Sequence, residues 1–192
     1  MALMLRKACQ PSLDEANLHE FHADIDPSSK NLVLFTPCGK RFAIVHGVVF
    51  GRLQPTNGEI EYAVSLLQQW LAKNNVLIRQ YIEAWVEFKS MTEPEEKIKT
   101  DTYKLELYNH YHYGRGIKLT YKEIAYTFKK DMTLADVDIT DALPADSWHK
   151  LITRPPATVM NATIKHLNLQ HRWLELKKIV DTIHGQLNSC YD

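Results

Sequence analysis

Residues 57–90, NGEIEYAVSLLQQWLAKNNVLIRQYIEAWVEFKS, decide how this chain folds. Apolar residues recur in this stretch at spacings that alternate between four and three residues. This rhythm predicts one face of a long helix that lies along another helix. The positions of the repeat are Ile60, Val64, Leu67, Leu71, Asn74, Ile78, Tyr81, Trp85 and Phe88.

The residues around this repeat predict a helix over about 57–90. Thr56 and Glu59 have the spacing of a capping box at its N-terminus, and Pro94 follows its expected end. Asn74 is the polar position of the repeat and has two interpretations. A buried asparagine can fix the register of a coiled coil. Alternatively, the helix bends or ends at Asn74 and restarts after it.

A second long helix is predicted over about 156–187, after a pair of prolines. Its apolar residues form two stripes, which lie on nearly opposite sides because two residues correspond to roughly 200° of rotation. Either the helix faces two partners in turn, or a kink near Asn168 turns both halves toward one core. The first stripe holds Met160, Ile164, Leu167 and Leu174, and the second holds Leu169, Trp173, Leu176, Val180, Ile183 and Leu187.

The remaining segments predict a small β-layer. Strand-forming residues at 31–36 and 41–53 flank a short turn and indicate a hairpin, and 101–119 indicates a second hairpin with one buried face. Another capping-box pattern predicts a short helix over 121–129. The acidic segment 130–154 is interpreted as a connector with one or two short helices.

Together these elements predict an α+β protein with a small mixed or antiparallel β-layer and two long helices. Residues 1–29 have no sustained hydrophobic rhythm and are expected to form an N-terminal arm, with one short helix at 13–23. Residues 30–192 are expected to form a single α+β domain that ends in the long C-terminal helix.

Composition and charge limit the classes of function. Basic and acidic residues both number 23, so the chain has no overall preference for nucleic acid or for an anionic membrane. Three scattered cysteines form no disulfide framework or thiolate metal site. No apolar run approaches the roughly 20 residues of a membrane span. We therefore expect a soluble, cytoplasmic protein in a reducing compartment, with no cofactor and no membrane partner.

The sequence VVFGRLQPTNGE at 48–59 resembles the nucleotide-binding turn of the HxGH/TxGH nucleotidylyltransferase superfamily, in its threonine variant. The resemblance implies a phosphate at the N-terminus of the following helix. The match departs from the family pattern at Glu59, because the family has a histidine there that contacts the triphosphate. A strand followed by a capped helix explains the same residues without a ligand.

A second resemblance concerns TYKEIAYTF at 120–128, which is similar to the first helix of helix-turn-helix proteins. Ile124 and Ala125 occupy positions at which that motif buries a bulky and a small residue. The match ends at the turn, where Lys129 stands instead of glycine. A short capped helix is the alternative interpretation.

His110 and His112 form an H-x-H pair, which on a strand would place both imidazoles on one face within reach of a metal ion. Glu106 shares that face, but no third ligand is assigned. A solvated strand face, with histidines that form local hydrogen bonds, is the alternative.

Tyr108, Tyr111 and Arg115 belong to the same segment and resemble a stacking surface for single-stranded nucleic acid. The basic residues nearby are offset by Glu106 and Glu123, so electrostatic capture would be weak. Cross-strand aromatic packing is the alternative, and binding of nucleic acid is not favoured.

The hypothesis that the sequence favours is a non-enzymatic assembly or scaffold subunit that docks through helix faces onto itself or another protein. This pattern would suit a viral or phage structural or accessory protein, which could be part of a virion. Nucleic-acid binding through 108–115 and a nucleotide- or metal-dependent enzyme are the alternatives. The predicted interface residues are Asn74, Tyr81, Trp85, Leu169, Trp173, Leu176 and Val180.

Overall fold

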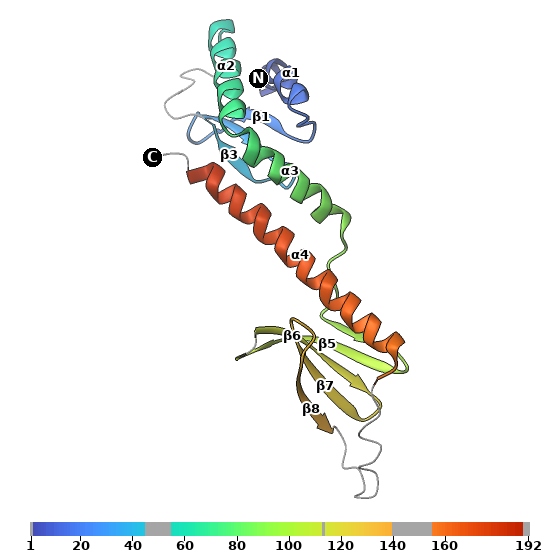
Figure 1. Ribbon diagram of the computed structural model, residues 1–192. Helices are drawn as coiled ribbons and strands as arrows, with labels where there is room; N and C mark the ends of the chain where they lie inside the picture. Colours follow the sequence, from blue (N-terminus) through green and yellow to red (C-terminus); the bar gives the residue numbers. More distant parts are fainter. Residues whose placement is uncertain (1, 45–54, 113, 140–154, 190–192) are drawn as a thin grey trace, which may run out of the picture. The chain divides into compact units, whose positions relative to one another are not determined.

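The computed structural model describes residues 2–44, 55–112, 114–139 and 155–189 of the chain. This part of the chain contains helices and two antiparallel sheets, of three and five strands, so the predicted α+β class is confirmed (Figure 1). The elements are α1 (Ala2–Glu15), β1 (His22–Ile25), β2 (Leu32–Phe35), β3 (Arg41–Ala43), α2 (Asn57–Lys73), α3 (Asn75–Ser90), β4 (Lys97–Lys99), β5 (Tyr103–His110), β6 (Gly114–Tyr121), β7 (Ile124–Lys129), β8 (Leu134–Ile139) and α4 (Ala157–Ser189).

The chain divides into two compact units. The first unit comprises Met1–Glu87 and Lys178–Asp192, and the second comprises Phe88–Lys177. This division differs from the expected arm and single domain, because residues 2–25 form α1 and β1 of the first unit. Leu5, Cys9 and Leu13 recur every four residues in α1 and are fully buried. Helix α1 therefore contributes to a core and is not a free arm.

The helix expected at 13–23 is wrong, because the chain reverses after α1. Asn17 adopts a positive φ of 58°. The N–H of Leu18 donates to the carbonyl of Leu13 (2.8 Å), and the N–H of Asn17 donates to that of Asp14 (3.0 Å). This pair of bonds is the Schellman motif, with Asn in the left-handed position that usually holds glycine. The motif ends the helix before strand β1.

The sheet of the first unit has the strand order β1-β2-β3, antiparallel throughout. The predicted hairpin is confirmed for β2 and β3, which are joined by a tight turn. Gly39 takes a φ of 76° in this turn, and the N–H of Thr36 donates to the carbonyl of Lys40 (2.8 Å). The rest of the expected second strand, at 45–54, lies outside the described residues.

The long helix predicted over 57–90 is divided at Asn74 into α2 and α3. Both the backbone N–H and the side-chain Nδ2 of Asn74 donate to the carbonyl of Trp70, each at 3.0 Å. The carbonyl of Asn74 accepts the N–H of Ile78 (2.9 Å), which begins α3. Asn74 thus ends one helix and starts the next, which is the second of its two sequence interpretations.

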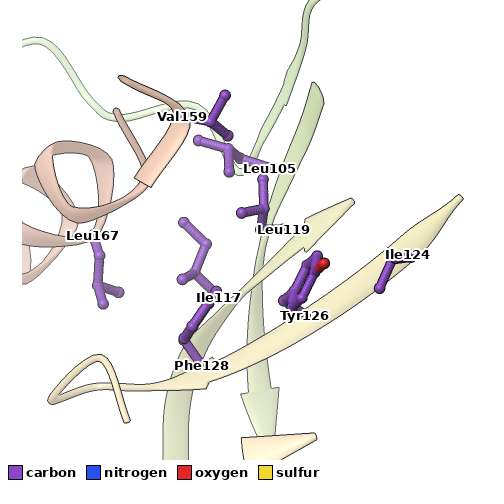
Figure 2. Close-up of a cluster of buried hydrophobic side chains, with 8 residues drawn as sticks. All are labelled: Leu105, Ile117, Leu119, Ile124, Tyr126, Phe128, Val159 and Leu167. Atoms are coloured by element: carbon purple, nitrogen blue, oxygen red, sulfur yellow. The ribbon is translucent and has the colours of Figure 1, made fainter. Parts of the chain in front are cut away.

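The second unit contains a five-stranded meander, in the order β4-β5-β6-β7-β8, with all pairs antiparallel. One face of the sheet is covered by the part of α4 that belongs to this unit. Figure 2 shows Val159 and Leu167 of α4 directed toward the apolar side chains of the sheet. The core consists of Leu105, Ile117, Leu119, Ile124, Tyr126, Phe128, Val159 and Leu167.

Two predicted elements of the second unit are corrected. Residues 124–129 form strand β7 and not a helix, because Ile124, Tyr126 and Phe128 alternate into the core with a period of two. Lys122 takes a φ of 56° in the turn before β7, which a helical start would not allow. Strand β8 replaces a helix in the expected connector at 130–154, of which residues 140–154 lie outside the description.

Helix α4 runs from Ala157 to Ser189 without a break at Asn168. The second predicted stripe is buried at every position except Leu169, whereas the first is buried only in part. Ile164 and Leu169 are 36% and 43% exposed, whereas the polar residues Thr163 and His166 are buried. The Thr163 hydroxyl donates to the carbonyl of Val159 (2.8 Å), which satisfies it inside the core. Counting only apolar residues therefore misplaced the buried face in the N-terminal half.

No helix among the described residues combines the length and apolar composition that crossing a membrane requires. Helix α4 illustrates this, because its 33 residues include charged side chains such as Lys165, Arg172 and Glu175.

Candidate functional site

The β5–β6 hairpin brings together residues that the sequence singled out for nucleic-acid binding. In its antiparallel register, Tyr108 pairs with Gly116 and Asn109 pairs with Arg115. These two adjacent pairs lie near the end of the hairpin. Tyr111, in the turn, is 91% exposed, and its ring meets that of His112 edge-on with 4.3 Å between centroids. The hairpin thus carries an exposed aromatic tip next to an arginine.

The two cross-strand pairs form one wall of a pocket of about 230 Å³. Leu167, Gln170 and His171, which follow the i, i+3, i+4 spacing of one helix face, form another wall. Polar groups of several kinds therefore converge on a small apolar floor, as in many ligand sites. The complete lining is Glu96, Leu107, Tyr108, Asn109, Arg115, Gly116, Leu167, Gln170 and His171.

Gly116 explains why the tyrosine can lie against the opposite strand. A Cβ atom at position 116 would lie 2.3 Å from the carbonyl oxygen of Phe128 and 2.9 Å from Cε1 of Tyr108. Both distances are shorter than any ordinary contact, and the carbonyl belongs to the backbone. The pocket wall therefore depends on the absence of a side chain at this position.

The segment just before β4, which contributes Glu96 to the pocket lining, is hydrogen-bonded to α4. The ring of His166 is hydrogen-bonded to the backbone of Glu95, and the N–H of Leu107 donates to the carbonyl of Glu96 (2.8 Å). Burial lowers the pKa of His166, and the bond to Glu95 only partly opposes this. His166 is therefore neutral at pH 7 and serves as a positioning residue for the segment that carries Glu96.

The charge around the pocket is cationic on the side of the hairpin. Burial lowers the pKa of His171, and the positive charges of Lys130 and Arg115 lower it further. Glu106, which the sequence placed against the cations, is held by Lys97 (2.6 Å between Nζ and Oε1). Residues 107–122 contain Arg115 and two lysines but no carboxylate. Glu106 is therefore engaged by Lys97, and Glu96 is the carboxylate that shares the pocket lining with Arg115.

Three buried polar atoms on α4 have no hydrogen-bond partner among the described residues: Nε2 of His166, Oε1 of Gln170 and Nε2 of His171. Gln170 and His171 line the pocket, and His166 lies one turn away on the same helix. Buried polar groups without partners cost free energy, so such a cluster indicates where a bound molecule would interact.

Most of the residues predicted to form a helix-face interface are buried within the chain. Five of its seven residues are buried in the chain itself, at 9% exposure or less, and so do not offer a free surface. Trp85 is half-buried, and Leu169 is exposed. The five buried residues are Asn74, Tyr81, Trp173, Leu176 and Val180.

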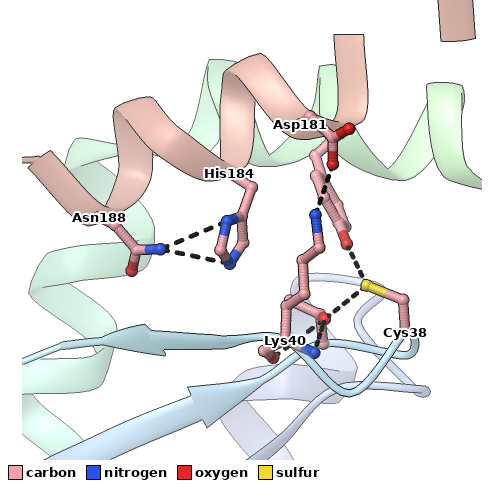
Figure 3. A network of polar contacts seen from close by, with 7 residues as sticks. Cys38, Lys40, Asp181, His184 and Asn188 are labelled. Carbon is pink, nitrogen blue, oxygen red and sulfur yellow. Dashed lines mark hydrogen bonds and ion pairs between the residues drawn. The ribbon is translucent and has the colours of Figure 1, made fainter. Parts of the chain in front are cut away.

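Tyr81 belongs to an aromatic and polar cluster of the first unit. Its ring meets those of Phe21 and Phe42 edge-on, at centroid distances of 6.0 and 5.9 Å. Its hydroxyl lies 3.2 Å from Sγ of Cys38, and burial raises the pKa of Tyr81. Figure 3 shows this contact in a wider network, in which Lys40 forms an ion pair with Asp181 (2.5 Å). Every group of this cluster is engaged within the unit.

Opposing effects act on the pKa of the Cys38 thiol. Burial opposes ionisation, but hydrogen bonds with Thr36 and Tyr81 and with the backbone of Lys40 outweigh it, so the pKa is lowered. Cys9, by contrast, has its pKa raised to about 11 by burial. Each thiol thus has its pKa set by its own surroundings in the first unit.

The predicted metal pair stays a prediction, because the side chain of His110 lies outside the described residues. His110 is the last residue of β5, whereas His112 lies in the turn, so the alternation of a strand does not extend over both positions. Among the described residues, no three His, Cys, Asp or Glu side chains gather as a metal site requires. Glu106 is held by lysines instead.

The turn that resembles the nucleotidylyltransferase motif is described only in part, because residues 48–54 lie outside the description. Its second half forms a complete capping box. The Glu59 carboxylate accepts the N–H of Thr56 (2.6 Å), and the N–H of Glu59 donates to the Thr56 hydroxyl (3.3 Å). The segment similar to a helix-turn-helix forms strands β6 and β7 and the turn between them.

No protein-family model, curated protein or solved structure matches this chain. The function therefore has to be argued from the site.

Sequence reasoning found Tyr108 and Arg115 but missed their neighbours in the pocket. The register of the hairpin, once its turn is known, would have placed Gly116 opposite Tyr108 and Asn109 opposite Arg115. Gln170 and His171 carry no such signal, because their place beside the sheet follows only from tertiary packing.

Proposed function

We propose that the second unit binds single-stranded nucleic acid through the β5–β6 hairpin. The observation that carries the proposal is the meeting of Tyr108 and Arg115 in one pocket, beside the exposed ring of Tyr111. Unpaired bases stack on aromatic side chains, and arginine contributes both charge and a planar surface. The arrangement offers all of these within one hairpin.

The electrostatics support this proposal. Glu106 is paired with Lys97, and residues 107–122 contain Arg115 and two lysines but no carboxylate, so Glu96 is the acidic residue that lines the pocket with Arg115. Arg115 and Lys130 both act on His171, so positive potential is concentrated at this end of the unit. A phosphate backbone is attracted to such a region, and its affinity falls as salt rises.

Binding is tested by fluorescence anisotropy of the full chain with a labelled 12-nucleotide single strand at several salt concentrations. Tyr111→Ala is expected to weaken binding about tenfold, since a base–aromatic stack contributes roughly 1–3 kcal/mol. Arg115→Gln is expected to weaken binding, because the variant loses both the positive charge and the planar guanidinium.

Matched controls come from the first unit. Tyr62 is 56% exposed and Arg79 is exposed, so Tyr62→Ala and Arg79→Gln remove the same side-chain types elsewhere. Both controls should bind as the wild type does. Absence of binding at low salt, or equal losses in the control variants, would refute the proposal.

Self-assembly remains a second candidate, because one part of α4 offers an apolar surface. Ile164 and Leu169 are exposed and line a hollow of about 410 Å³, together with polar residues. A second copy of the chain is the occupant we propose. A dimer by mass measurement in solution, which Leu169→Asp dissociates, would support it. A monomer at high concentration would exclude it.

A further inference from the structure

The pocket between the β5–β6 hairpin and α4 is small. Its volume of about 230 Å³ is below the roughly 300 Å³ at which sites for drug-sized ligands begin. At about 30 Å³ for each water molecule, this space corresponds to several waters, or to one flat ring system. The size is suited to a single base and not to a longer segment of a strand.

The hydrogen-bonding groups of the pocket lining favour a base over a phosphate as the ligand. Phosphate oxygens only accept hydrogen bonds, so a phosphate site is lined by donors. Here Glu96 contributes to the lining, and Oε1 of Gln170 is a buried acceptor without a partner among the described residues. These acceptors call for a ligand that carries hydrogen-bond donors.

The same pocket also offers donors. The Arg115 guanidinium and the amide of Asn109 face a ligand that must accept as well as donate. Guanine meets both conditions better than the other bases. It has O6 and N7 as acceptors, which arginine commonly recognises, and it donates from its N2 amino group and from N1. Adenine, cytosine and thymine each present fewer donors.

We propose that this pocket receives one guanine base of the bound single strand, with Arg115 facing its acceptors and Gln170 accepting from its donor edge. This inference rests on the proposed function. Tyr108, fixed against Gly116, supplies the aromatic wall, and the exposed Tyr111 stacks on a neighbouring base without regard to its identity. The pocket then adds base preference to a general affinity for single strands.

The experiment compares labelled strands of twelve thymidines in which one central position is changed. Guanine, adenine, cytosine and inosine, which is guanine without its N2 amino group, are placed there in turn. The full chain is expected to bind the guanine strand about tenfold more tightly than the all-thymidine strand, as for one well-made base contact. Inosine should lose part of this gain.

Two variants assign the preference to the pocket. Gln170→Leu removes the acceptor at nearly constant size and should abolish the guanine preference, measured as the ratio of the affinities for the guanine strand and the all-thymidine strand. Gln170→Glu keeps the acceptor and should retain the preference, which distinguishes recognition from a general structural defect. Gln69→Leu, at an exposed position of α2, is the matched control.

The outcomes separate the two proposals. If no strand binds, the proposed function fails, and this inference fails with it. If all strands bind equally, if another base is preferred, or if Gln170→Leu keeps the guanine preference, the inference alone is overturned. Unchanged circular dichroism spectra and melting temperatures of the variants confirm that the comparisons are made on folded protein.

Discussion

In the first unit, the buried polar residues Ser12, Asp26, Thr36 and Asn74 all have hydrogen-bond partners. In the second unit, three buried polar atoms on one stretch of α4 have none among the described residues, and two of their side chains border a pocket. The second unit also pairs its buried Thr163, so the difference is confined to the stretch of α4 beside the pocket, which has capacity for further hydrogen bonds.

Two tyrosines, Tyr81 and Tyr111, also differ between the two units in their burial. Tyr81 is 1% exposed and contacts two other rings, whereas Tyr111 is 91% exposed at the tip of a hairpin. Both were singled out by sequence, one as an interface anchor and the other as a nucleic-acid contact. A side chain that is already covered has little further surface to bury, so Tyr81 contributes to the core of its unit, whereas the ring of Tyr111 is accessible.

The largest effect is expected from Tyr81→Ala. Removing a fully buried aromatic side chain leaves a cavity and should lower the free energy of unfolding by about 4 kcal/mol. Tyr81→Phe, which loses the contacts of the hydroxyl with Cys38 and Thr36, should lower it by about 1 kcal/mol. Urea unfolding measures both.

Tyr62→Ala is the control for this pair, because Tyr62 is 56% exposed in the same unit. Its effect should stay within about 0.5 kcal/mol. If Tyr81→Ala instead leaves stability intact and changes the oligomeric state, Tyr81 is an interface residue and the assignment made from its burial is wrong.

Gly116→Ala should cause the next largest loss, about 3 kcal/mol, because its Cβ would overlap the Phe128 carbonyl and the Tyr108 ring. Gly185→Ala is the matched control. Gly185 lies within α4, and a Cβ atom at this position would extend into open space, so alanine should raise stability by roughly 0.5–1 kcal/mol. Thermal unfolding checks both, and similar effects at the two positions would contradict the geometry at Gly116.

The sequence was most informative where the local pattern and the tertiary environment agree. The helices over 57–90 and 156–187 were located closely, and Asn74 was recognised as a possible end, because capping and helical periodicity act within a few residues. Strand β7 was missed, because a capping-box pattern at its start outweighed the alternation of Ile124, Tyr126 and Phe128. That alternation becomes decisive only when a neighbouring strand is present.

Only the part of the candidate site that lies in one hairpin could be predicted from the sequence. Tyr108 and Arg115 belong to one hairpin, so their proximity follows from a local turn. Gln170 and His171 are distant in sequence, and their polar side chains gave no reason to place them beside a sheet. In the same helix, the buried Thr163 and the exposed Leu169 reverse the usual preference, so hydrophobicity alone misassigned these positions. It did identify the buried residues of the C-terminal half, which are Trp173, Leu176, Val180, Ile183 and Leu187.

The smallest expected effect is at Asp26 and depends on pH. Its carboxylate accepts the backbone N–H of Ser28 (3.1 Å) and hydroxyl bonds from Ser28 (2.8 Å) and Ser29 (2.9 Å), and Arg41 pairs with it. These bonds from Ser28 and Ser29, with a smaller contribution from Arg41, lower the pKa of Asp26 to about 2.

Because the folded pKa lies below the ordinary value of 3.8, Asp26 stabilises the fold at pH values above that value. This contribution is lost as the pH falls from about 4 to about 2. Asp26→Asn should therefore be less stable than the wild type at pH 7, and the two proteins should converge as the pH approaches 2. Asp101→Asn, at an exposed position of the second unit, is the control and should run parallel to the wild type. A constant gap between Asp26→Asn and the wild type over this range, measured by urea unfolding, would show that the paired carboxylate does not stabilise the first unit as its contacts indicate.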